Sequence, residues 1–522
     1  MLNFNYKNMK RYNSIFTLIT GALFVVMLWS CSEEFLERPP EDTYSLDEFY
    51  SSNEQVSAST NGLYGKVWFN LHNKALYAIG EVGSGNSFSY SSDINSLRLL
   101  NITTTDPVLL DAWKSCFAVV AQSNALINLL PPRVAAEVDK DVLDNTIAEA
   151  HFMRALAYFY LVRYWGPVPI IENNADYVKE PQLNTNRVED IYTFIEDDLN
   201  YAAEFLYAKV RGSNYSENGH VSKGSANALL AKVYLYEKKY DQARQLAQEV
   251  INSGEFKLYG GAVLPDKSFG DLFLTENNNN EESIIAWQWT LGGYNTGNYS
   301  NTQFAYSSVI NNATYGGVFA PSQDLLAAFE PGDLRRKETV MLPGDYYPNL
   351  PSANGPDFTV PDDINAQNSG SGIKKYVVGK TGNTDSFRGS PNNSYVMRYA
   401  DVFLIHAEAI LGSNSSTSDP AALESYNTIR ERAGLQPVTS FTFDDLLHER
   451  RIEFAFEADY WFDLGRIPRE KAVEIVAAQN RGDKDYPEYA EPLPNDFILP
   501  YPSSELILNP KLGEAPVSYD FN

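Results

Sequence analysis

Apolar residues recur every three or four positions along much of this chain, which is the spacing of amphipathic helices. In the segment 188–206, six apolar side chains fall on one helical stripe: Val188, Ile191, Ile195, Leu199, Ala202 and Leu206. A preceding helix is predicted from Asn145 up to Gly166-Pro167, where glycine and proline end it. Each helix must bury one side, so the pattern predicts helices that pack on one another.

Two regions indicate helical hairpins. Within 225–253, two short helices meet at Lys239-Tyr240-Asp241, and Gly254 is placed to end the second. Their apolar faces contain several alanines, which allow close packing and are typical of tetratricopeptide hairpins. A similar pair is predicted at 399–411 and after Asp419-Pro420, where the aspartate caps the helix and the proline occupies its first turn.

Between the hairpins lies a long segment of different composition. Further helices are predicted at 52–69, begun by a Ser52/Gln55 capping box, and at 109–130 and 443–457. By contrast, 261–393 is rich in Gly, Asn, Pro, Ser and Tyr, with helical spacing only at 322–330. Loops this long are usually functional, so we expect the binding site to draw on this segment.

The N-terminus has the layout of a secretory signal. Lys7, Lys10 and Arg11 precede an apolar run at 15–29, which is too short to span a membrane. Residues 1–30 are therefore predicted to be a signal peptide. A small residue followed by Cys31 resembles the lipobox of bacterial lipoproteins, so Cys31 is the predicted lipidation site, and a secreted protein with a chance cysteine is the alternative. Ser32-Glu33-Glu34 resembles the acidic signal that sends lipoproteins of the Bacteroidetes to the outer cell surface.

Charge narrows the choice of partners. The leader carries three basic and no acidic side chains, so its removal changes the formal net charge from −26 to −29. Such a surface repels nucleic acid phosphates and anionic headgroups, so no nucleic acid partner is expected. An uncharged ligand, or a partner with a basic surface, fits better.

Catalytic and cofactor motifs are not found. His448-Glu449 begins like a zinc motif, but Ile452 stands where the second histidine belongs. Gly379-Lys380-Thr381 lacks the earlier glycine of a phosphate-binding loop, and no GxSxG elbow occurs. We therefore predict no enzymatic activity, no cofactor and no metal, although a glycosidase carboxylate pair cannot be sought without geometry.

The sequence feature that does indicate a function is a group of aromatic residues among amides and hydroxyls. Such a mixture suits neutral, hydroxyl-rich ligands, because a flat ring packs on the apolar face of a sugar while amides bond its hydroxyls. Tyr294 and Tyr299 lie among Gly and Asn, where they serve either as ligand platforms or in loop packing. The candidate ligand residues, in order of preference, are Trp289, Tyr294 and Tyr299, then Trp68, Asn86 and Tyr90.

Four blocks stand out along the chain: EAHFMRALAYFYLVRYWGPVPII at 149–171, RYADVFLIHAEAI, HERRIEFAFEADYWFDLGR at 448–466, and FILPYPSSELILNPKL. Together they resemble the SusD/RagB family of outer-membrane nutrient-binding lipoproteins. They run in family order over the whole mature chain. The arginines in and beside these blocks lie among aromatics and acids, so internal ion pairs or helix packing explain them better than ligand binding: Arg154, Arg163, Arg398, Arg450 and Arg451.

The resemblance implies a fold and a role. The fold is mostly α, with tetratricopeptide-like hairpins in a right-handed array and a loop-rich, partly β insertion that carries the ligand site. The implied parts are an N-terminal helical part at 31–260 and a C-terminal part at 261–522, in which 261–393 is loop-rich and 394–522 returns to helix.

The implied role is a non-catalytic receptor, lipid-anchored at the outer-membrane surface. It would bind oligosaccharide or polysaccharide and deliver it to a TonB-dependent, SusC-like transporter. A peptide receptor of the same family is the second reading. A helical-repeat scaffold or an unrecognised glycoside hydrolase is the distant alternative.

Overall fold

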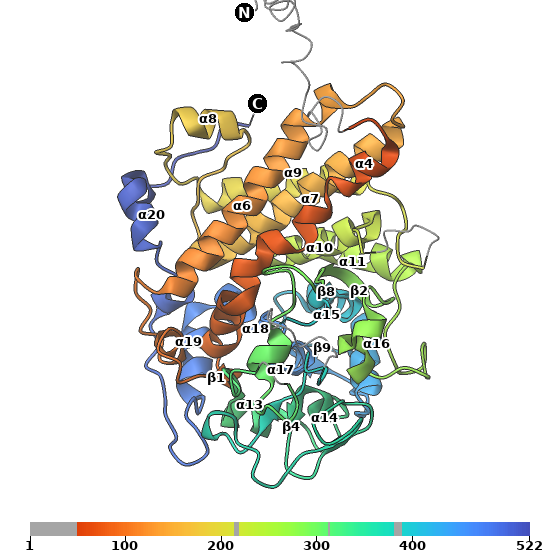
Figure 1. Ribbon diagram of the computed structural model, residues 1–522, viewed down its shortest axis with the longest axis vertical. Helices are drawn as coiled ribbons and strands as arrows, with labels where there is room; N and C mark the ends of the chain where they lie inside the picture. The colour runs from red at the N-terminus through yellow and green to blue at the C-terminus, as the bar shows by residue number, and fades with distance from the viewer. Residues whose placement is uncertain (1–49, 213–218, 312–313, 381–388, 522) are drawn as a thin grey trace, which may run out of the picture.

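Seven helices form the main body of the protein in the computed structural model, which describes residues 50–212, 219–311, 314–380 and 389–521. Each of them packs on the next in chain order (Figure 1): α6 (Pro107–Leu129), α7 (Lys140–Trp165), α9 (Val188–Phe205), α10 (Lys223–Tyr236), α11 (Tyr240–Ser253), α15 (Tyr399–Leu411) and α16 (Pro420–Arg432). Their buried faces belong to one large apolar core. The predicted mostly helical fold with tetratricopeptide-like hairpins is confirmed.

The helix ends follow the local signals in the sequence. Gly254 follows α11 in the left-handed conformation, with φ at +64°. At the start of α16, the Asp419 side chain accepts a hydrogen bond of 2.9 Å from the Ala421 N–H, and Pro420 is the first helical residue. Capping therefore sets where these hairpin helices begin and end.

The predicted helix at 52–69 is wrong in its extent. Helix α4 covers only Asn53–Ala58, and 3-10 turns follow at Asn61–Tyr64 and Lys66–Trp68. Gly65 breaks the run, because a Cβ there would lie 2.5 Å from the carbonyl oxygen of Gln288. The predicted capping box is only half formed, since Ser52 accepts from the Gln55 N–H while the Gln55 side chain accepts from Ser51.

Helical structure then continues beyond Phe69, where the sequence pattern predicted none. It includes π-helical turns at Leu71–Ala75 and Ala78–Gly83. The predicted helix at 443–457 also differs, since α17 ends at Glu453. Phe456 and Ala458 behind it take φ values of +64° and +65°, which are outside the helical range.

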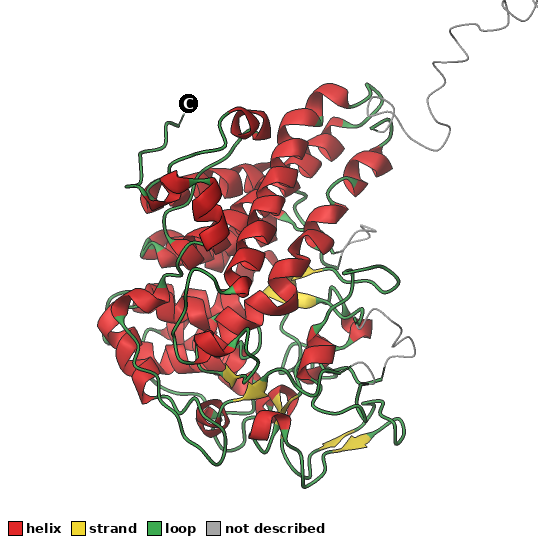
Figure 2. Ribbon diagram, turned by 60° about the vertical axis from the view of Figure 1, so that its left-hand side comes forward, coloured by secondary structure: helices red, strands yellow, loops and turns green. Residues whose placement is uncertain are grey.

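The segment 261–393 is built from loops and short elements (Figure 2). Its helices are α12 (Ser300–Phe304), α13 (Gln323–Ala328) and α14 (Arg335–Thr339). Antiparallel two-stranded ladders join β1 (Ser87–Phe88) to β3 (Ala320–Pro321), β2 (Ser283–Trp287) to β8 (Ser394–Arg398), β4 (Val340–Met341) to β7 (Gly372–Ile373), and β5 (Tyr346–Tyr347) to β6 (Phe358–Thr359).

Smaller elements complete the described chain. Strands β9 (Ser416–Thr417) and β10 (Phe441–Thr442) flank α16, and the remaining helices are α5 (Asn95–Arg98), α8 (Asn174–Lys179), α17 (Phe443–Glu453), α18 (Tyr460–Arg466), α19 (Arg469–Ala478) and α20 (Ser503–Leu508). Within the described ranges, no helix is both long and apolar enough to cross a bilayer. The predicted signal peptide, Cys31 and Ser32-Glu33-Glu34 lie outside the described residues.

Buried ion pairs attach the loop-rich segment to the helices. Arg398, at the start of α15, contacts Glu282 at 2.5 Å and both Glu453 and Glu457 at 2.8 Å. Arg335 of α14 contacts Glu449 at 2.6 Å and Glu453 at 3.0 Å. Glu282 and Arg335 belong to the loop-rich segment, while their partners lie at the end of β8 and in α17. Arg398, which lies in a family block, therefore joins two parts of the fold through internal ion pairs, as predicted.

Candidate functional site

Two of the candidate tryptophans lie in the core. Trp68 is fully buried and donates its indole N–H to the carbonyl oxygen of Leu63 at 2.7 Å. Trp289 is also buried and donates to the Ser394 hydroxyl at 3.1 Å, with its ring 4.5 Å from that of His72. Burial lowers the pKa of His72 to about 3, so this cluster is neutral. Both tryptophans therefore have structural partners and no open ring face.

Asn86 is buried and connects two distant segments. Its amide donates to Glu81 at 3.1 Å, and its oxygen accepts from the Arg451 guanidinium at 2.7 Å. Its backbone carbonyl also accepts from the Ser322 N–H at 3.0 Å. These bonds position the loop that follows Asn86, which carries Tyr90.

Tyr90 presents its ring at the surface, with 43% of the residue exposed. Its hydroxyl donates to Asp483 at 3.1 Å, and the Arg98 guanidinium lies 5.0 Å from the ring centroid. Partial burial and the Asp483 carboxylate raise the pKa of Tyr90, so its hydroxyl stays protonated. The ring is thus held in a fixed orientation while much of it remains open.

Tyr90 lines a surface pocket of about 550 Å³ together with residues from four other segments. The lining consists of Asn73, Lys74, Tyr90, Ser91, Gln303, Tyr315, Val318 and Gln367, and we call it the tyrosine pocket. Tyr315, 49% exposed, supplies the second ring. The β1–β3 ladder brings the two tyrosines together, since Phe88 pairs with Ala320. Tyr315 is not among the candidate residues selected from the sequence.

The amides of the tyrosine pocket are held in place by neighbouring groups. Gln367 accepts from the Tyr90 N–H at 3.2 Å and donates to the Gly317 carbonyl at 2.8 Å. Gln303 donates to the Asn73 side-chain oxygen at 3.0 Å. Gln303 is only 2% exposed, and its own Oε1 has no hydrogen-bond partner in the described chain.

The charge of the tyrosine pocket is close to neutral. None of the described residues that line it is Asp or Glu, although the chain carries 67 acidic residues. Lys74 forms an ion pair with Asp93 beside the pocket. Two open rings, fixed amides and balanced charge make a surface that suits a neutral polyhydroxyl ligand.

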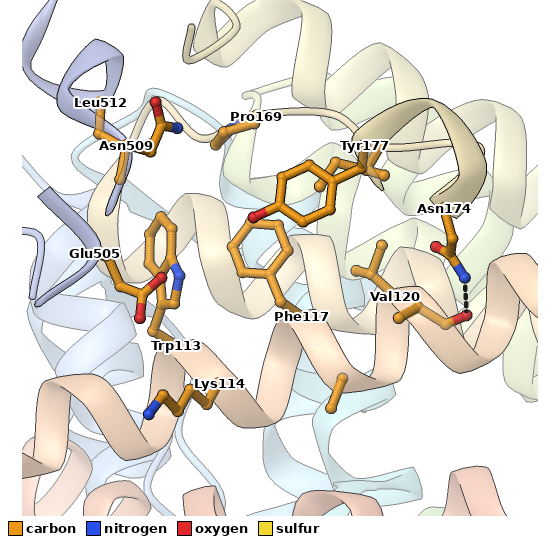
Figure 3. A pocket seen from close by; sticks show the side chains of 13 residues that line it. Trp113, Lys114, Phe117, Val120, Pro169, Asn174, Tyr177, Glu505, Asn509 and Leu512 are labelled. Carbon is orange, nitrogen blue, oxygen red and sulfur yellow. Dashed lines mark hydrogen bonds between the residues drawn. The ribbon is translucent and has the colours of Figure 1, made fainter. Parts of the chain in front are cut away.

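A second pocket, of about 310 Å³, has a different character. The rings of Trp113, Phe117 and Tyr177 line it, between α6, α8 and the chain around α20 (Figure 3). Its Asn174 amide is already used, donating to the Ala121 carbonyl at 2.8 Å and accepting from Asn124 at 3.3 Å. This aromatic pocket suits an apolar group better than a sugar, and it contains none of the candidate residues.

The remaining candidates lie beyond the tyrosine pocket. Tyr294 is 73% exposed, and Tyr299 is half-buried with its ring edge-on to Phe69 at 5.0 Å. Both belong to the segment that leads to Gln303. Among the described residues, no group of His, Cys, Asp and Glu side chains is arranged to hold a metal ion.

The fold and the pocket define a helical-repeat protein with a neutral, tyrosine-lined surface site. Residues 260–517 match the model of the SusD family, and residues 34–235 match a family described as starch-binding and associating with the outer membrane. A SusD-like protein of Bacteroides ovatus is 33% identical, with 97% of this chain and 98% of that protein aligned. The chain belongs to the SusD family.

Solved structures agree with this assignment. A crystal structure with xylogluco-oligosaccharide is 33% identical, with a TM-score of 0.79 over 90% of this chain and 99% of that one. A laminarin-binding SusD-like protein is 26% identical, with a TM-score of 0.68 over 88% of this chain and 98% of that one. The similarity extends over the helices and the loop-rich segment alike.

Proposed function

We propose that this protein is a non-catalytic glycan receptor that binds an oligosaccharide in the tyrosine pocket. The observation that carries the proposal is the pairing of two half-exposed tyrosines with fixed amides, in a lining whose described residues include no acid. Relatives that bind xylogluco-oligosaccharide and laminarin support the same ligand class. Glycosidases need two carboxyl groups at the scissile bond, and the part of this lining that the structure describes supplies none.

The receptor acts at the cell surface in this proposal. A lipid on Cys31 anchors it to the outer membrane, and a TonB-dependent, SusC-like transporter receives the glycan. The family description that mentions the outer membrane supports the location. If Cys31 is the anchor, a Cys31→Ala variant grown with a labelled fatty acid stays unlabelled; label that still enters the protein would place the anchor elsewhere.

Binding by the purified protein tests the ligand class and the pocket. A glycan array, followed by calorimetry on the best ligand, should yield a neutral oligosaccharide. A sugar that covers one ring face removes roughly 60 Å² of apolar surface from water, which is worth about 1.5 kcal/mol or roughly tenfold in Kd. Tyr90→Ala and Tyr315→Ala should each lose about that much affinity.

Tyr346→Ala is the matched control for these variants. Tyr346 is 47% exposed and donates its hydroxyl to Asp357 at 2.9 Å, much as Tyr90 donates to Asp483, but it does not line the tyrosine pocket. Its substitution should leave affinity unchanged. Full binding by both pocket variants would overturn the assignment of the site, whereas selective binding of peptides would favour the peptide receptor. Release of sugar from a polysaccharide would contradict the non-catalytic role.

A further inference from the structure

A second polar pocket, of about 650 Å³, lies beside the same helical run as the tyrosine pocket. Its lining includes Asn61, Lys66, Asn279, Gln288, Thr290 and Thr296, and we call it the amide pocket. Like the tyrosine pocket, it has no Asp or Glu among the described residues that line it. In so acidic a chain, two pockets that share this property call for a common explanation.

Two segments run side by side from one pocket to the other. Near the amide pocket, the Gln288 N–H donates to the Tyr64 carbonyl at 2.7 Å. Midway, the Phe69 ring meets those of Trp289 and Tyr299, with centroids 6.3 and 5.0 Å away. At the tyrosine pocket, Gln303 donates to Asn73. The segments 61–75 and 288–303 therefore form a continuous seam with a pocket at each end.

Polar side chains follow the seam along its exposed face. Lys66 lines the amide pocket, Asn73 lines the tyrosine pocket, and the exposed Asn70 lies between them. They follow one another along this run, which begins with the 3-10 turn at Lys66–Trp68 and continues through the π-helical turn at Leu71–Ala75.

The groups in the amide pocket are oriented in advance. Gln288 and Asn279 exchange two hydrogen bonds, of 2.9 and 2.8 Å, and Asn393 donates to the Gln288 oxygen at 2.9 Å. Lys66 is exposed and has no ion-pair partner within the described part of the chain. Fixed amides with a free ammonium beside them can bond sugar hydroxyls, as the amides of the tyrosine pocket can.

We propose that the two pockets are the ends of one binding track, and that its ligand is an oligosaccharide of several units lying over Asn70. This inference rests on the proposed function, because it assumes that the tyrosine pocket holds part of the same glycan. Contacts in the amide pocket are made by the same glycan chain that already occupies the tyrosine pocket. They therefore raise the affinity only of ligands that are long enough to reach both pockets.

Affinity as a function of chain length tests the track. Oligomers of the glycan selected by the array, from the shortest that binds upward, should bind more tightly until the track is filled. In the double variant with Lys66→Ala and Asn70→Ala, the longest oligomer should bind roughly fivefold more weakly, about the worth of one hydrogen bond, while the shortest should bind as before. Lys179→Ala on the exposed α8 is the control and should change neither.

The outcomes separate this inference from the proposed function. Equal affinity for short and long oligomers, or an unchanged long-oligomer affinity in the double variant, would overturn the track while Tyr90→Ala still lost binding. A uniform loss for every length in the double variant would also overturn it, because it would place Lys66 and Asn70 in the primary site. If Tyr90→Ala bound all lengths normally, both proposals would fail together.

Discussion

The helical body and the two polar pockets use their polar side chains in opposite ways. In the helical body the charges are buried and paired, as where Arg450 contacts Asp401 at 2.6 Å and Asp463 at 2.9 Å. In the pockets most of the polar groups are neutral amides and hydroxyls, with Lys74 and Lys66 beside them. The segments that resemble the family most closely thus form the scaffold, while the pockets draw on segments without those motifs.

The largest loss of folding stability should come from breaking the buried ion pairs. Arg398→Ala leaves Glu282, Glu453 and Glu457 buried with less compensating charge. Removal of one partner from a buried pair costs about 3–5 kcal/mol, so the free energy of unfolding should fall by that amount in denaturant titrations. Arg244→Ala is the control, because Arg244 and Asp241 form a surface pair at 3.7 Å that is worth less than about 1 kcal/mol. Equal losses in the two variants would contradict the comparison.

Two buried carboxyl groups, those of Glu81 and Glu453, should contribute differently to the pH dependence of the free energy of unfolding. Burial raises the pKa of Glu81 to about 7, so the folded protein keeps this proton where the unfolded chain, with a pKa near 4.5, has lost it. The free energy of unfolding therefore falls as pH rises from about 4.5 to 7, by at most about 3 kcal/mol from this group. Denaturant titrations at pH 5 to 8 should give a flatter profile for Glu81→Gln than for the wild type.

Glu453 provides the opposite case. Although burial acts to raise its pKa, the arginines Arg432, Arg398 and Arg335 outweigh it and hold the pKa well below the usual range. A depressed pKa stabilises the folded state above the unfolded pKa, and that stabilisation is lost only as pH falls below about 4.5. Glu453 should therefore add no slope between pH 5 and 8. Parallel profiles for Glu81→Gln and the wild type would show that Glu81 does not titrate in this window.

The hairpins could be predicted from the sequence because their contacts are local. Helix spacing and caps fix α10, α11, α15 and α16 within short stretches of chain. The tyrosine pocket depends on contacts across more than 200 residues, since Gln303 bonds Asn73 and Ser89 donates to the Val318 carbonyl. The spacing of apolar residues along the sequence does not predict contacts between such distant segments.

Exposure of the aromatic residues was the least predictable property. Trp289 and Tyr294 lie in one short stretch of aromatic and polar residues, yet one is buried and the other is 73% exposed. The difference arises because Trp289 follows β2, where it donates to Ser394 of the paired strand β8. The sequence indicated the ligand class through its aromatic and amide content, while the pocket itself required the strand pairing.

The smallest change in both stability and ligand affinity should come from Tyr294→Ala. This side chain is mostly exposed and lines neither polar pocket, so the free energy of unfolding should change by less than about 0.5 kcal/mol. Affinity for the longest oligomer should fall by less than roughly threefold, well short of the tenfold expected for Tyr90→Ala. Calorimetry and denaturant titration on the same sample separate binding from stability. A loss as large as that of Tyr90→Ala, with the fold intact, would show that the glycan extends from the seam onto the loop at 290–299, and that the binding surface reaches beyond the two pockets.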